Sequence, residues 1–159
     1  MRKTHAALAV LFGASLALSG FASTAHADPP GNNGTVKIDG VTFDTSPDNE
    51  PHVGCSFQVD FYGFDQGALN AGVTFEVQPP TGKAVVLKTD TVFIGEDAAG
   101  GGTDLDAQRT YNLSSALATF TPHPQQGYHV YLTVEADGSQ GAKTKHKVFW
   151  VQACTSNPT

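Results

Sequence analysis

The chain has 159 residues, with 17 Gly, 9 Pro and 15% charged residues, against about 25% charged in an average soluble protein. Its formal net charge of −6 excludes a protein that binds nucleic acid or another polyanion through clustered basic residues. This length accommodates one domain, and the Gly- and Pro-rich composition indicates a turn-rich β fold.

The first 27 residues have the features of an export signal. Arg2 and Lys3 form a positive start, residues 6–18 are apolar but short for a membrane span, and an A-x-A cleavage site ends at Ala27. We expect a mature chain that begins at Asp28 and, without Arg2 and Lys3, has a net charge of −8. No second apolar run and no lipidated cysteine follows, so we expect release to the extracellular space, with loose wall association as the alternative.

The mature chain alternates apolar and polar residues in short stretches bounded by turn residues, the pattern of β-strands. We expect a disordered leader over 28–34, one domain over 35–154 and a C-terminal tail over 155–159. The clearest strand is 55–62, where Phe57 and Val59 alternate with polar residues. The other expected strands cover residues 35–43, as one edge strand bent at Gly40, and residues 73–77, 85–87, 91–94, 109–113, 128–135 and 143–154.

No amphipathic helix is expected, and the connection over 114–126 has room for one helical turn at most. This pattern predicts an all-β fold: an antiparallel β-sandwich of about seven strands, immunoglobulin-like in size and strand spacing, with one disulfide.

Cys55 and Cys154 are the two cysteines of the chain, and an even count in an exported protein predicts that they form a disulfide. The bond would close a loop of 99 residues and be structural rather than catalytic. Val148, Trp150 and Cys154 share one face of the last expected strand. A tryptophan packed on this disulfide would resemble the core of immunoglobulin domains.

Six blocks of the mature sequence resemble a group of small exported actinobacterial proteins. The blocks are GNNGTVKI (31–38), NEPHVGC (49–55), DFYGFD (60–65), QPPTG (78–82), QGYHV (126–130) and KHKVFWV (145–151). The resemblance implies secretion and a β-sandwich. It implies no functional residues, because no activity is established for the group.

Metal binding has two candidate sets of residues. Glu96, Asp97, Asp104 and Asp106 lie in and around a glycine-rich loop and are weak calcium candidates, because their spacing matches no EF-hand loop. We expect no required calcium and no cofactor. The histidines of the mature chain are His52, His123, His129 and His146. If the cysteines are bonded, His52 and His146 are expected about 17 Å apart or more, because a strand rises about 3.3 Å per residue.

A copper site is a narrower alternative. If cleavage instead followed Ala25, His26 would become the N-terminus and could chelate copper through its amine and imidazole. The simpler expectation is that His26 leaves with the signal.

The sequence indicates the function only by elimination of other classes of protein. No G-x-S-x-G or other catalytic motif occurs, so we expect a non-enzymatic binding or envelope-associated module, with a small-ligand carrier, a metal-binding protein or a hydrolase as alternatives. We expect a monomer whose partner is a protein, glycan or cell-wall component. Tyr62, His129 and Tyr131 are the candidate binding face. Lys143, Lys145 and Lys147 are interpreted as a solvated strand face.

Overall fold

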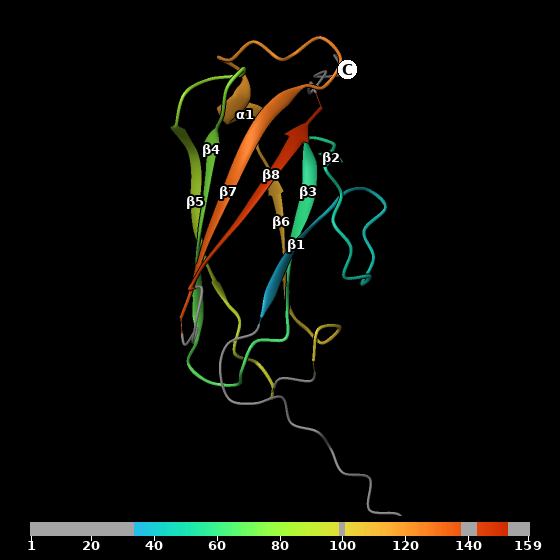
Figure 1. Cartoon of the computed structure of the whole chain (residues 1–159), viewed down its shortest axis with the longest axis vertical. Coiled ribbons are helices and arrows are strands. Elements are labelled where there is room, and N and C mark those ends of the chain that lie inside the picture. The colour runs from blue at the N-terminus through green and yellow to red at the C-terminus, as the bar shows by residue number, and fades with distance from the viewer. Residues whose placement is uncertain (1–33, 99–100, 138–142, 153–159) are drawn as a thin grey trace, which may run out of the picture.

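A computed structural model describes residues 34–98, 101–137 and 143–152 (Figure 1). The all-β prediction is confirmed over these residues, where the helical element is the short α1 (Ser114–Leu117). The strands are β1 (Thr35–Asp39), β2 (His52–Val53), β3 (Ser56–Tyr62), β4 (Asn70–Val77), β5 (Val85–Phe93), β6 (Leu105–Asn112), β7 (Tyr128–Ala136) and β8 (Thr144–Val151). The predicted export signal, the leader before Gly34, the tail and Cys154 lie outside the described residues.

The strands form two sheets, with the orders β1-β3-β6 and β2-β8-β7-β4-β5. All pairings are antiparallel except that of β2 with β8, so the prediction of a wholly antiparallel arrangement is wrong at this edge. The segment before β2 aligns the two strands, because the Trp150 N–H donates to the Pro51 carbonyl at 2.8 Å. The Gln152 N–H then donates to the Val53 carbonyl at 2.8 Å.

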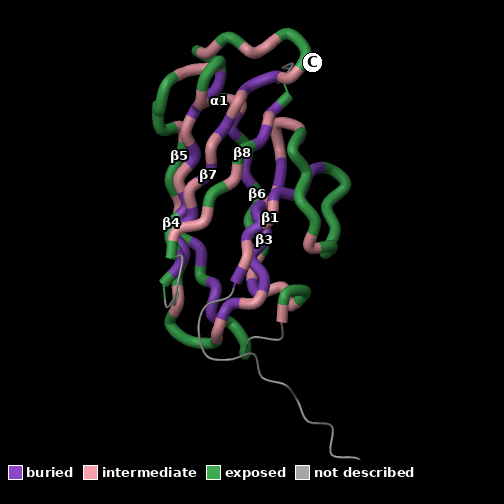
Figure 2. Tube along the Cα trace, viewed as in Figure 1, coloured by how far each residue is buried: buried purple, intermediate pink, exposed green. Residues whose placement is uncertain are grey.

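A single core cluster joins the inner faces of the two sheets, and Figure 2 shows buried segments running along both. Its centre is aromatic: the Phe57 ring of β3 lies 5.7 Å from that of Phe75 and 5.1 Å from that of Phe149, both edge to face. Tyr111 of β6 lies 4.8 Å from Phe75. Such offset ring pairs add about 0.5–1.5 kcal/mol beyond the burial of apolar area.

Several strand boundaries differ from the predicted ones. Residues 41–43 form no strand, and Val41 is exposed beyond the Gly40 break. The two short strands expected within 85–94 are one continuous strand, β5. Its burial does not alternate regularly, so the sequence pattern does not indicate a single long strand. β6 begins at Leu105, inside the segment predicted as a glycine-rich loop.

The last strand, β8, has the reverse facing from the one expected. Phe149 and Val151 are buried in the core, whereas Val148 is exposed and Trp150 lies on the outer face. The expectation that Trp150 lies in the core is therefore wrong, while its expected partner Cys154 lies outside the described residues. Successive strand residues point to opposite faces, so an error of one position in the inward-facing residue reverses the whole strand.

The lysines of β8 also differ from the expected solvated face. Lys145 and Lys147 lie on the inward-facing side and are half-buried, and burial lowers the pKa of both. The Lys145 Nζ lies 5.8 Å from the centre of the Phe64 ring. Their long aliphatic stems allow partial burial while the ammonium groups stay near water.

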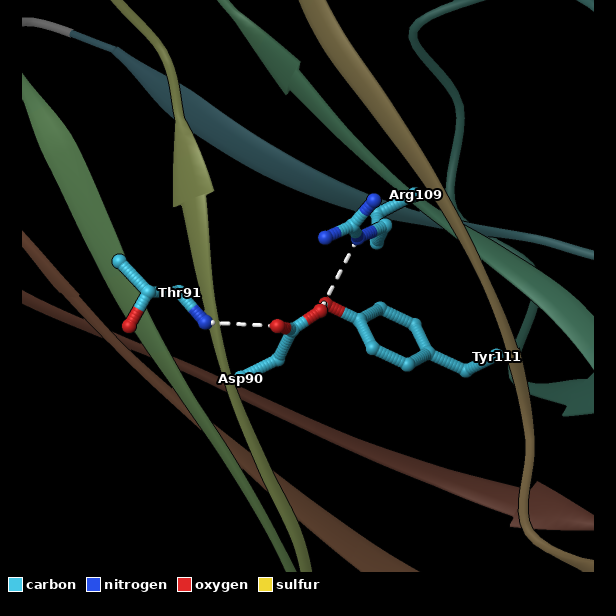
Figure 3. Close-up of polar contacts among 4 residues, drawn as sticks. All are labelled: Asp90, Thr91, Arg109 and Tyr111. Carbon is cyan, nitrogen blue, oxygen red and sulfur yellow. Dashed lines mark hydrogen bonds and ion pairs between the residues drawn. The ribbon is translucent and has the colours of Figure 1, made fainter.

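A polar contact links the two sheets where β5 lies beside β6 (Figure 3). Arg109 Nε lies 3.0 Å from Asp90 Oδ2, and the Tyr111 hydroxyl donates to the same oxygen at 3.2 Å. The Thr91 N–H donates to the other oxygen, Oδ1, at 2.8 Å. Burial opposes ionisation of Asp90, but these three donors outweigh it and lower the pKa of the carboxyl.

Candidate functional site

The outer face of the larger sheet carries a group of rings on β7 and β8. We call it the outer aromatic face and define it by five residues: His129, Tyr131, His146, Val148 and Trp150. The His129 ring stacks on Trp150 with centres 4.4 Å apart and planes 23° apart. The Tyr131 ring stacks on His146 at 5.1 Å and 18°.

Hydrogen bonds hold His129 in this position. Its Nδ1 lies 2.6 Å from the Pro79 carbonyl oxygen, and because a carbonyl only accepts, Nδ1 carries the proton. The His129 backbone N–H donates to the Thr81 hydroxyl at 2.7 Å. The turn after β4 therefore sets the angle at which the imidazole meets the Trp150 ring.

A tight loop borders one end of the outer aromatic face. The His123 ring lies 5.9 Å from that of Trp150, edge to face, and His52 Nε2 is hydrogen-bonded to Gln126 Oε1 at 2.8 Å. Gly127 closes the loop with φ of +87°, and a Cβ there would collide with the Val151 carbonyl oxygen. The loop thus requires glycine at this position.

Tyr62 does not belong to this face, so that part of the predicted binding surface is wrong. It lies in the smaller sheet and is fully buried. The register of β3 with β6 shifts between Phe61 and Tyr62, at the end of the strand. Burial raises the pKa of the Tyr62 hydroxyl to about 12, and the nearby carboxylates of Asp60, Asp39 and Asp44 add to the effect.

The four histidines of the described ranges lie on one side of the molecule, and none of them belongs to a group of side chains that could share a metal ion there. His123 and His129 both contact Trp150, and His52 pairs in register with Trp150. Over the described ranges, the side chains close enough to share an ion are instead three aspartates.

Asp97, Asp104 and Asp106 form the acidic cluster: one ligand atom from each lies within 4.8 Å of the others. Three of the four calcium candidates thus come together, whereas the side chain of Glu96 is not in the group. Burial raises the pKa of Asp106 to about 6, and the carboxylates of Asp104 and Asp97 add to the effect. The sequence alone does not show that these three carboxylates meet, because the distances between them depend on how the loop folds back to β6.

A cleft of about 520 Å³ lies between β5 and β6, next to the acidic cluster. Its lining is mainly polar and includes Glu96, Asp106 and Arg109, and Phe93 forms an apolar part of the wall. Sequence reasoning missed this cleft, because it depends on the approach of two sheet edges. Among the described residues, no helix is long and apolar enough to cross a membrane.

Comparisons of the chain with protein-family models, with curated proteins and with solved structures give no match.

Proposed function

We propose that the chain is an exported, non-enzymatic binding domain that recognises a protein partner outside the cell or at its envelope, through the outer aromatic face. The observation that carries this proposal is the group of paired rings on an open sheet face, with Val148 half-exposed between them. Aromatic side chains are enriched in protein interfaces, where they bury a large apolar area and still offer a polar atom.

The ring geometry favours a protein over a sugar ring as the partner. Each ring already has a stacked partner, His129 on Trp150 and His146 on Tyr131, so fewer aromatic faces are left for stacking on a sugar than in a set of isolated rings. The paired rings offer edges and polar atoms, which suit hydrogen bonds and edge contacts with a protein surface. The acidic net charge argues against a polyanionic partner.

An immunoglobulin-like arrangement is part of the same proposal. The order β1-β3-β6 opposite β8-β7-β4-β5 corresponds to strands A-B-E opposite G-F-C-C′ of immunoglobulin domains. A disulfide between Cys55 and Cys154 would join the start of β3 to the chain after β8. In its support, Cys55 Sγ lies 3.8 Å from the carbonyl oxygen of Gln152, two residues before Cys154.

A small-ligand carrier is the second candidate, and the cleft between β5 and β6 favours it. Its volume of about 520 Å³ lies in the range of small-molecule sites, roughly 300–1,000 Å³. The mainly polar lining and open shape fit a small polar ligand better than an apolar one.

The test is a pull-down from culture filtrate and envelope fractions of the producing cells with three forms of the mature protein. These are the wild type, a face variant with Tyr131→Ala and Trp150→Ala, and a cleft variant with Phe93→Ala. Phe93 is an exposed aromatic residue of another strand, so its removal also controls for the loss of any surface ring. Trp150 is the single tryptophan of the chain, so its fluorescence reports binding of an isolated partner at the face.

We expect the wild type and the cleft variant to retain a common protein partner that the face variant loses. Equal recovery of that partner by all three forms would contradict the proposed face. Loss by the cleft variant alone, or a bound small molecule released from the wild type on denaturation, would support the carrier instead.

A further inference from the structure

The acidic cluster contains a buried carboxylate oxygen that the fold leaves unsatisfied. Asp106 is 4% exposed, and its Oδ2 accepts the Phe64 N–H at 2.9 Å. Its Oδ1 is buried and has no hydrogen-bond partner. Burying a carboxylate is costly unless it is paired, hydrogen-bonded or bound to a metal ion.

The neighbours of Asp106 do not offset this cost. The nearest charged side chains in the cluster are further carboxylates, those of Asp97 and Asp104. Neither Asp97 nor Asp106 forms an ion pair with a described residue. A buried, unsatisfied oxygen within a group of negative charges therefore points to a positive ligand.

We propose that Asp97, Asp104 and Asp106 bind one Ca²⁺ ion. Ca²⁺ takes six to eight oxygen ligands at about 2.3–2.6 Å, so two ligands on opposite sides of one ion lie about 4.6–5.2 Å apart. The carboxylate atoms of the cluster, all within 4.8 Å of one another, fit this span without rearrangement. Water and backbone carbonyls of described neighbouring residues would supply the remaining ligands, as is usual for Ca²⁺.

The fold also explains why this site needs no EF-hand spacing. The three ligands lie within the stretch from Asp97 to Asp106: Asp97 follows β5, Asp104 precedes β6 and Asp106 lies within β6, so the connection between the two strands brings them together without the spacing of an EF-hand. The cluster is tied to the end of β3 as well, through the Gly63 N–H on the Asp104 carbonyl and the Phe64 N–H on Asp106. A bound ion would therefore hold the loop against both β3 and β6.

The available ligand atoms favour Ca²⁺ over Mg²⁺. Mg²⁺ requires near-octahedral geometry at about 2.0–2.1 Å and keeps most of its water, whereas Ca²⁺ accepts irregular sets of carboxylates and carbonyls. A glycine-rich loop with three carboxylates suits the larger and less demanding ion.

The experiment uses the mature protein, stripped with EDTA and dialysed, in calorimetric titrations with CaCl₂ and with MgCl₂. Thermal unfolding is measured in parallel with EDTA and with 5 mM CaCl₂. The variants are Asp97→Asn, Asp104→Asn and Asp106→Asn, each with circular dichroism as a check of folding. Glu96→Gln is the matched control, because it removes one carboxylate next to the cluster but outside it.

We expect the wild type and Glu96→Gln to bind one Ca²⁺ and to melt several degrees higher with Ca²⁺ than with EDTA. Asp97→Asn and Asp104→Asn should bind Ca²⁺ at least tenfold more weakly. These two residues are less buried than Asp106, so they keep the test decisive if Asp106→Asn fails to fold. The proposal is overturned by absence of binding at 5 mM CaCl₂, by equal affinity for Mg²⁺, or by equal weakening in Glu96→Gln.

Discussion

The Tyr111 hydroxyl of β6 donates a hydrogen bond to the Asp90 carboxylate of β5, so one acidic residue joins the two sheets at a shared edge. Tyr111 also packs its ring against Phe57 and Phe75. The contact therefore connects the aromatic core to the polar rim of the cleft, where Arg109 completes the group.

We expect Tyr111→Phe to lower the free energy of unfolding by about 1 kcal/mol, because it removes a partly buried hydrogen bond and keeps the ring. Arg109→Ala should have a smaller effect than Tyr111→Phe, since its side chain is 50% exposed and water screens the ion pair. Urea denaturation of the single and double variants with Asp90→Asn would measure the coupling. Additive effects of Tyr111→Phe and Asp90→Asn would contradict the contact.

The same contact has a defined pH dependence. The pKa of Asp90 is lowered in the folded state, because the hydrogen bonds to its carboxylate outweigh its burial. The stability that it contributes is therefore complete above its unfolded pKa, near 4, and is lost as the pH falls towards the folded pKa. Unfolding measured from pH 5 to pH 2 should show this loss in the wild type and a smaller loss in Asp90→Asn.

Asp60 has the opposite pH behaviour. It is fully buried on β3, and burial, together with the nearby carboxylates of Asp39 and Asp44, raises its pKa to about 6. The folded state holds this proton more tightly than the unfolded state, so stability falls as the pH rises from about 4 to about 6. We expect Asp60→Asn to be more stable than the wild type at pH 7, by at most about 3 kcal/mol for a shift of about two units.

The measurement is urea denaturation at pH 4, 5, 6 and 7 with EDTA present, so that metal binding does not contribute. Asp48→Asn, an exposed site with the same change of charge, is the control. Equal stability differences between Asp60→Asn and the wild type at pH 4 and pH 7 would show that this carboxyl ionises normally.

The proposed disulfide leads to a third prediction. Replacing Cys55 and Cys154 together by Ser should lower the free energy of unfolding by about 4 kcal/mol on the chain-entropy model, because the bond closes a long loop in the unfolded chain. Partner binding below the melting temperature should persist. Thiol titration of the denatured wild type checks the bond directly, and the detection of two thiols would contradict it.

The expected processing gives a fourth prediction. Intact mass spectrometry of the protein from culture medium should show a chain that begins at Asp28. A product that retains residues 1–27 would contradict export by this signal, and a product that begins at His26 would support the copper alternative.

The alternation of apolar residues was enough to predict most of the sandwich strands and much of the core. Phe57, Val59 and Phe61 are buried as their spacing indicates, and so are Val130 and Leu132. Burial of one strand face is a local property, because side chains two positions apart share that face. The short helix α1 also lies in the connection where one turn was expected.

The errors arise where the environment of a strand is set by distant segments. Tyr62 is on the polar side of β3 by alternation, yet it is fully buried, with carboxylates of distant segments, those of Asp39 and Asp44, nearby. Trp150 is large and apolar, but β8 places Phe149 and Val151 inward and leaves Trp150 to stack on His129. Neither outcome depends on the residues of the strand alone.

The sequence by itself determined the all-β class and the inward rows of most strands, because period-two patterning acts over neighbouring residues. Only the tertiary structure decided the parallel pairing of β2, the facing of β8 and the meeting of Asp97, Asp104 and Asp106. The reason is physical: the pairing of β2 and the facing of β8 arise from contacts between segments far apart in the chain, whose geometry depends on how two sheets pack around a common core. The three aspartates lie close in the chain, but whether their carboxylates meet depends on the path from β5 to β6.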